Sequence, residues 1–192
     1  MKTLKLFILA LLVTPLFTSC GYNSMVEKSE AVDASWAQVQ NVYQRRSDLI
    51  PNLVATVKGY AAHESQTLEG VIEARAKATS VNINADQLTP EKLAEFQKAQ
   101  QGLSGALGKL MMITENYPDL KANQNFLDLQ AQLEGTENRI TVERQKFNET
   151  TRDYNTYIKK FPRNMYAGWF DFKSKPYFAA EAGTEKAPKV EF

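Results

Sequence analysis

The chain has 192 residues, of which 43% are hydrophobic and 23% are charged, as in a single globular domain of ordinary size. Its 23 basic and 22 acidic residues give a formal net charge of +1, which argues against a nucleic-acid partner because such proteins carry a clustered basic surplus. One cysteine and one histidine exclude an internal disulfide and every metal site that needs two imidazoles. Together with the missing motifs described below, these counts lead us to expect no metal and no cofactor.

Residues 1–19 have the features of an export signal that is removed from the mature protein. Lys2 and Lys5 precede an apolar stretch from Leu6 to Val13, which is the order of charges and apolar residues in secretory signals. This stretch is short, and Pro15 follows it, whereas a membrane-spanning helix needs about 20 apolar residues. A retained transmembrane anchor is the alternative.

The string Phe17-Thr18-Ser19-Cys20 resembles the bacterial lipobox, in which a peptidase cleaves before a cysteine that then carries lipid. Leucine is usual at the position of Phe17, and an ordinary secretory signal with a free thiol at Cys20 is the alternative. Two or three acyl chains on Cys20 would anchor the protein stably, with residues 20–23 as the anchored N-terminus. We expect a lipoprotein of the bacterial cell envelope whose domain lies outside the cytoplasm, at the outer membrane or the periplasmic face.

Residues 24–162 show apolar residues at helical spacing. The pattern predicts an all-α domain with four long helices, over residues 24–47, 51–80, 91–117 and 119–161. Thr89 and Pro90 read as the cap and first turn of the third helix. The fourth helix has the strongest periodicity, with an apolar residue every seven positions: Phe126, Leu133, Ile140, Phe147, Tyr154 and Phe161.

Whether the first two predicted helices are separate depends on the backbone conformation at Pro51. A sevenfold phase runs straight through it, as in one kinked helix, over Met25, Val32, Val39, Arg46, Leu53 and Tyr60. One helix reaching residue 80 would extend beyond the third helix and leave its first half in water, at about 1.5–3 kcal/mol per large side chain. We therefore predict a turn near residues 45–50 and an up-and-down antiparallel four-helix bundle. The alternative is one kinked helix completed by a homo-oligomer.

Residues 163–178 contain six aromatic residues. We expect this segment to fold back and close the open end of the bundle. The alternative is an exposed apolar patch that receives a partner or lies on lipid. Residues 179–192 are typical of a solvated tail.

The sequence lacks a nucleotide-binding loop, a nucleophile elbow and zinc-ligand spacing. His63 falls beside Glu64 on the second predicted helix, where adjacent side chains point about 100° apart and cannot share a proton. Gly102, Gly105 and Gly108 lie within an apolar helical pattern and indicate close helix packing. We predict that the protein is not an enzyme.

Polar residues flank the apolar stripe of the fourth predicted helix at the same sevenfold spacing: Gln130, Glu137, Arg144 and Thr151. Such a polar seam is typical of residues that fix helix register, because a mispaired helix would bury an unpaired charge. We predict a structural polar clamp at the helix junction, formed by Arg46, Asp48, Asn52, Glu137, Arg139 and Arg144.

The string GYNSMVEKSEAVDASWAQVQNVYQRRSDLIPNLVATVKGYAAHE, which begins at Gly21, resembles the signature of the LemA family of bacterial proteins. The likeness continues through ENYPDLKANQNFLDLQAQLEGTENRITVERQKFNETTRDYNTYIKKFP and the residues from Ala167 to Phe170. The resemblance implies a helical bundle, an N-terminal membrane attachment and no known enzymatic activity or catalytic residue.

Genes of the resembled family often lie beside those of membrane proteases and envelope proteins, which suggests envelope quality control. We expect a non-enzymatic adaptor that is attached to the membrane through Cys20 and binds another envelope protein. The alternative is a carrier of lipid or another apolar ligand within the bundle.

Lipidation at Cys20 predicts a defined mass. The full-length protein expressed in a bacterium should lose residues 1–19 and gain two or three acyl chains, and Cys20→Ala should abolish both changes. Intact-mass measurement and detergent partitioning of the two proteins test this. An uncleaved product, or a cleaved soluble product with a free thiol, would contradict a lipid anchor.

Overall fold

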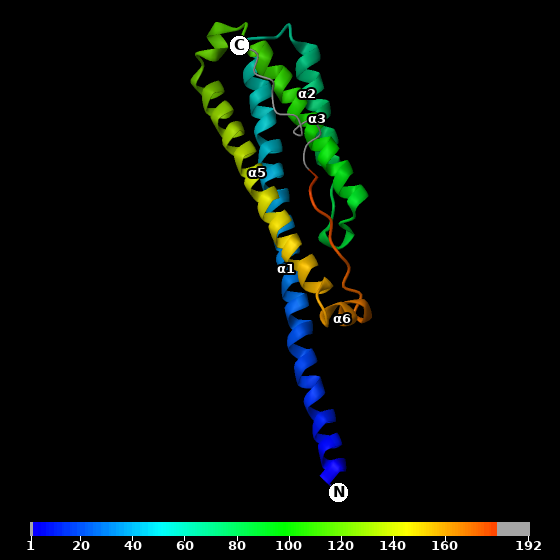
Figure 1. Cartoon of the computed structure of the whole chain (residues 1–192). Helices are drawn as coiled ribbons and strands as arrows, with labels where there is room; N and C mark the ends of the chain where they lie inside the picture. The colour runs from blue at the N-terminus through cyan, green and yellow to red at the C-terminus, as the bar shows by residue number, and fades with distance from the viewer. Residues whose placement is uncertain (1, 180–192) are drawn as a thin grey trace, which may run out of the picture. The chain divides into compact units, whose positions relative to one another are not determined.

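The computed structural model describes the backbone of residues 2–179 and the side chains of residues 21–179. All regular elements in this range are helical, which confirms the all-α class (Figure 1). The elements are α1 (Lys2–Lys58), α2 (Ser65–Ser80), the short 3-10 helix η1 (Ala85–Gln87), α3 (Pro90–Thr114), α4 (Pro118–Lys121), α5 (Gln124–Lys159) and α6 (Arg163–Trp169). The narrower prediction of an up-and-down antiparallel four-helix bundle stays a prediction.

The predicted turn near residues 45–50 is wrong, because α1 continues through Pro51 to Lys58. A proline inside a helix lacks the N–H that would bond the carbonyl four residues earlier, which here belongs to Ser47. The Nε of Arg75, on α2, donates a hydrogen bond to this carbonyl at 2.9 Å. The acceptor that Pro51 leaves without its helical donor therefore has a partner on the neighbouring helix.

The chain forms two compact units, which we describe separately. Of the described residues, the first unit comprises 2–45 and 136–175, and the second unit comprises 46–135 and 176–179. Helices α1 and α5 each contribute to both units.

The core of the first unit is made by the facing apolar stripes of α1 and α5. Its buried residues are Met25, Val32, Trp36, Val39 and Tyr43 on α1, and Ile140, Phe147, Tyr154 and Ile158 on α5. The rings of Trp36 and Phe147 lie 5.7 Å apart, as in favourable aromatic pairs. The prediction of a turn assumed that only the third helix could cover the first half of α1, whereas in the structure α5 covers it.

The apolar stripe of α5 is confirmed up to Tyr154. Phe161, which continues the sevenfold spacing, was expected to extend it. It lies beyond Lys159, the last residue of α5, and is 79% exposed. The sevenfold spacing of apolar residues therefore extends past the end of α5.

The core of the second unit combines residues from α1 to α5: Ile50, Leu53, Val57, Ala61, Leu68, Val71, Ala78, Leu103, Leu110, Leu120, Phe126 and Leu133. The predicted run over residues 51–80 is divided by the turn at residues 59–64, so Leu53 belongs to α1 and Leu68 to α2. His63 lies exposed in that turn and not on a helix.

Two side chains cap helices in the second unit. The predicted cap of α3 is confirmed, because the Oγ1 of Thr89 accepts a hydrogen bond from the N–H of Lys92 at 3.3 Å. The predicted fourth helix is divided into α4 and α5, and the Oδ1 of Asn123 accepts from the N–H of Phe126 at 3.0 Å. Asn at this position satisfies one of the free amides at the start of α5.

The contact between Arg75 and the Ser47 carbonyl gives a testable coupling. Arg75→Ala should lower the free energy of unfolding by about 1.5–3 kcal/mol, because it removes a charged donor from this carbonyl. In a Pro51→Ala background the same change should cost less, because residue 51 then supplies its own N–H. Urea denaturation of the four proteins measures the difference.

Lys77→Ala is the matched control, because Lys77 is an exposed cation on the same helix. It should change the free energy of unfolding by less than about 0.5 kcal/mol in either background. If Arg75→Ala costs the same with Pro51 as without it, the hydrogen bond does not compensate for the proline.

Candidate functional site

Arg46 is buried in the second unit and binds α3. Its guanidinium donates to the Oε1 of Gln100 at 2.7 Å, to the backbone carbonyl of Gln100 at 3.3 Å and to the Oγ of Ser104 at 2.8 Å. The Nε2 of Gln100 donates in turn to the carbonyl of Ala78, on α2, at 3.3 Å. These bonds use the two terminal nitrogens of the guanidinium, whereas its buried Nε makes no hydrogen bond. Hydrogen bonds to a buried charge offset part of the cost of burying it, so this network favours one register of α1, α2 and α3.

The other residues of the predicted clamp are divided between the two units. Asp48, Asn52, Glu137 and Arg139 are exposed, and Arg144 is half-buried. Glu137, Arg139 and Arg144 belong to the first unit, whereas Arg46 belongs to the second. A clamp formed by all six residues stays a prediction. Its partners on α3, Gln100 and Ser104, were missed, because both are single polar residues outside any sevenfold pattern.

In the first unit, the segment after α6 is held by side chains of α5. The Nδ2 of Asn155 donates to the carbonyl of Lys175 at 2.8 Å, and the N–H of Lys175 donates to the Oδ1 of Asn155 at 2.9 Å. The hydroxyl of Tyr154 donates to the carbonyl of Lys173 at 3.0 Å. These bonds satisfy the backbone of an extended segment as a neighbouring strand would.

The side chain of Lys175 adds an ion pair with Asp33, on α1. Burial, followed by the charge of Asp33, raises the pKa of Tyr154. Its hydroxyl therefore remains a protonated donor to the carbonyl of Lys173 at neutral pH. The ion pair and the Asn155 amide together fasten the segment to both long helices.

The chain reverses direction at the end of α6. The N–H of Phe172 donates to the carbonyl of Ala167 at 2.9 Å, and Asp171 has a φ of 59°, as in the Schellman motif that ends many helices. The segment therefore returns towards α5 through Lys173 and Lys175, while Trp169 remains 74% exposed. Within residues 163–178, the backbone at Lys173 and Lys175 is therefore held by α5, whereas Trp169 is exposed. Closure of the bundle end and contact with a partner or lipid both stay predictions.

Exposed apolar side chains gather around α6. We call this set the aromatic surface; it consists of Phe161, Met165, Trp169 and Phe170. Tyr22, near the start of the described side chains, contacts it, with its ring 4.9 Å from the ring of Phe170 and 5.7 Å from that of Phe172.

A groove of about 500 Å³ lies between α2 and α3 in the second unit. It is lined by Gln66, Thr67, Gly70, Ala74, Gly102, Gly105, Ala106 and Lys109. A Cβ built on Gly102, Gly105 or Gly108 would meet no atom within 4 Å. The expectation that these glycines serve close helix packing is therefore wrong for the described chain.

The described residues offer neither a metal site of clustered ligands nor a membrane-spanning helix. These residues contain no group of three or more His, Cys, Asp or Glu that could hold a metal ion. No helix among them is long and apolar enough to cross a membrane. The side chain of Cys20 and the segments 1–19 and 180–192 lie wholly or partly outside what the structure describes, so the lipid anchor and the tail stay predictions.

A model of the LemA family matches residues 35–192. The chain belongs to this family. Over 174 residues it is 28% identical to magnetosome protein MamQ 2 of Paramagnetospirillum magneticum, covering 82% of this chain and 64% of the relative. Over 175 residues it is 29% identical to magnetosome protein MamQ of Magnetospirillum gryphiswaldense, with the same coverage.

Protein LemA of Metamycoplasma hominis is 25% identical over 158 residues, which cover 82% of this chain and 68% of that protein. The chain therefore spans somewhat less than two thirds of the MamQ relatives that it matches. None of these names describes an enzyme.

The double hydrogen bond of Asn155 predicts a local opening. Asn155→Ala should raise the hydrogen-exchange rate of the backbone around Lys175 by about 5- to 30-fold, which corresponds to a loss of about 1–2 kcal/mol. Exchange measured by mass spectrometry on peptides covering residues 172–179 tests this. Asn164→Ala, an exposed asparagine on α6, should leave these peptides unchanged. Equal exchange in both variants would show that Asn155 does not hold the segment.

Proposed function

We propose that this LemA-family protein is a membrane-tethered lipoprotein of the bacterial envelope that acts as a non-enzymatic adaptor. It is attached through Cys20 and binds an α-helix of another envelope protein in the groove between α2 and α3. Envelope quality control is the setting that the family association suggests. The observation that carries this proposal is the presence of glycines in the groove that nothing else in the described chain requires.

Glycine in a helix interior weakens the helix by about 0.5–1 kcal/mol relative to alanine. Gly102 and Gly105 lie inside α3, where open space surrounds the position of each missing Cβ. Small residues on a helix surface allow the backbone of a second helix to approach closely. Close approach of a partner helix would explain why glycine and not alanine is present at these positions.

The rim of the groove suits a protein helix better than a lipid. Gln66, Thr67 and Lys109 supply polar groups, and the rest of the lining is glycine and alanine. Pockets for apolar ligands are lined mainly by large hydrophobic and aromatic side chains. The groove therefore gives no support to the alternative of a lipid carrier.

The names of the relatives are consistent with a protein that is not an enzyme. Two of the matched proteins from different species are named for the magnetosome and none for a reaction. The adaptor role, the partner and the membrane tether are carried to this chain as proposals.

Gly105→Ala and Gly108→Ala should each raise the free energy of unfolding by up to about 1 kcal/mol, because alanine stabilises a helix interior and its Cβ meets no atom here. Urea denaturation of the two single variants checks the sign. A loss of stability at Gly105 would reveal a requirement within the chain, and the glycines would then carry no argument for a partner.

The adaptor proposal is tested by photocrosslinking in living cells. A photoreactive residue at position 66, in the groove, should give a discrete crosslinked product that contains a single envelope protein. Gly105→Gln fills the groove and should abolish this product. Gly108→Gln places the same side chain on the same helix outside the lining of the groove, and should preserve it.

If the crosslinked product forms in both glutamine variants, or in neither, the partner does not bind in the groove. The absence of any product from position 66, with the protein folded and at normal abundance, would contradict the adaptor role there.

A further inference from the structure

The aromatic surface lies near Cys20, the proposed point of membrane attachment. Tyr22 follows Cys20 by two residues, about 3 Å along a helix, and its ring contacts those of Phe170 and Phe172. A lipid on Cys20 fixes this end of the first unit at the membrane surface. A retained N-terminal membrane helix ending near Cys20 would do the same.

The surface has the composition of a membrane interface. Trp169 is 74% exposed, Phe170 57% and Met165 50%, far more than large apolar side chains in contact with a core. Tryptophan and other aromatic side chains favour the headgroup region of bilayers. Such a surface in water is unfavourable unless something covers it.

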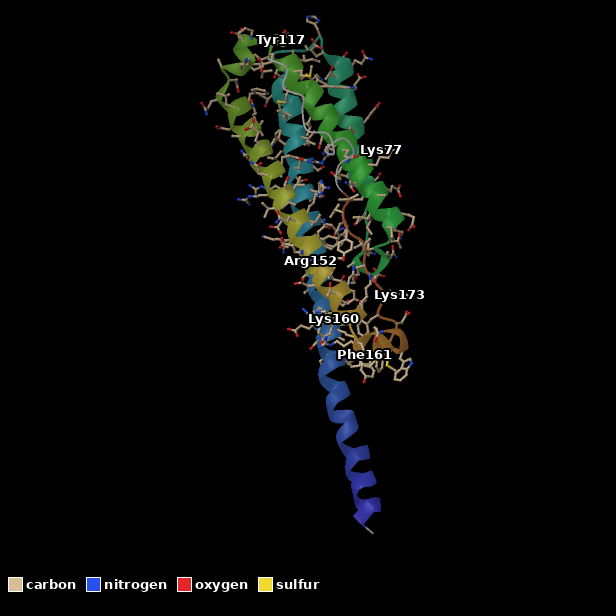
Figure 2. All side chains as sticks on the ribbon, viewed as in Figure 1. Lys77, Tyr117, Arg152, Lys160, Phe161 and Lys173 are labelled. Atoms are coloured by element: carbon tan, nitrogen blue, oxygen red, sulfur yellow. The ribbon has the colours of Figure 1, made fainter. Side chains whose placement is uncertain are left out.

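The charges around the surface fit an anionic bilayer. Residues 159–175 contain five basic residues and one acidic residue. Two of the five form ion pairs, Lys173 with Asp171 and Lys175 with Asp33. Lys159 and Lys160 are exposed at the end of α5, and Lys173 is exposed after α6. Figure 2 shows Lys160, Phe161 and Lys173 around this part of the first unit. Lysines at such positions extend their apolar stems along the surface and place their ammonium groups at lipid phosphates.

We propose that the aromatic surface lies in the headgroup region of the bilayer, with Trp169 inserted and the exposed Lys159 and Lys160 at the phosphates of anionic lipids. This inference rests on the proposed tether and deepens it, since it adds a second attachment to the lipid on Cys20. The turn after α6 and the contacts of Asn155 with Lys175 hold the surface in place. A bilayer is the occupant because the surface begins beside the attachment point.

The two tryptophans of the chain make a direct test possible. Trp36 is 1% exposed and lies 14 residues beyond Tyr22, which corresponds to about 21 Å along α1. Trp36→Phe leaves Trp169 as the sole emitter, and Trp169→Phe leaves Trp36 as the matched control. The lipidated mature proteins are placed in phosphatidylcholine–phosphatidylglycerol vesicles, with or without bromine on the acyl chains near the headgroup.

Brominated lipid should reduce Trp169 fluorescence by about half, as expected of a ring at interfacial depth, and leave Trp36 fluorescence unchanged. If Trp36→Phe does not fold, the difference between the unsubstituted protein and Trp169→Phe gives the same quantity. Vesicle flotation measures the tether separately.

Flotation with Trp169 unquenched by bromine and quenched by aqueous iodide would overturn the membrane surface and leave the tether standing. Failure to float would overturn both. If Trp169 is shielded from iodide in native membranes but accessible in pure lipid vesicles, a protein covers the surface, and the proposal is wrong.

Discussion

The uninterrupted course of α1 through Pro51 is the constraint on which the described fold depends. One helix supplies Trp36 to the core of the first unit and Leu53 to that of the second. A proline in a helix interior costs about 3 kcal/mol, and part of that cost is the carbonyl of Ser47 left without its helical donor. Arg75 supplies the missing donor. Within the second unit, α2 therefore both packs on α1 and completes its hydrogen bonding.

Polar contacts determine the register of the helices, which burial of the apolar stripes alone does not determine. Hydrophobic burial is non-directional, so a stripe such as that of α5 allows several registers of similar energy. Arg46 bonds to Gln100 and Ser104 in a geometry that a shift of one helical turn would break, leaving a buried cation with poor partners. Asn155 acts similarly on Lys175, because it satisfies both backbone groups of one residue.

The sequence predicted the buried faces of α1 and α5, because burial follows a short-range period that repeats over many turns. The prediction of a turn near Pro51 was wrong because a contact with another helix offsets the local effect of the proline. Proline predicts a break from local chemistry alone, but the donor that offsets it lies 28 residues from Ser47. The prediction that Phe161 continues the buried stripe was wrong because the sevenfold spacing extends beyond the last residue of α5. The phase of Arg46 singled it out as a buried polar residue. Asn155 had no such signal, because nothing in its spacing separates it from the solvated polar residues of α5.

Each unit has an exposed surface that the fold itself does not require: the aromatic surface in the first unit and the groove between α2 and α3 in the second. Their chemistry suits different binding partners. The exposed side chains around Trp169 are large, aromatic and flanked by lysines, which suits the thick interfacial region of a bilayer. The groove around Gly105 is lined by glycine and alanine with polar residues at its rim, which suits a helix that must come close. Lipid would gain little from Gly105, and a partner helix could not approach the backbone of α6 past Trp169. If both surfaces are occupied as we propose, the aromatic surface sets how the first unit meets the membrane, and the groove is left to receive a protein. The two sets of substitutions should then affect different measurements, because neither surface has the chemistry to replace the other.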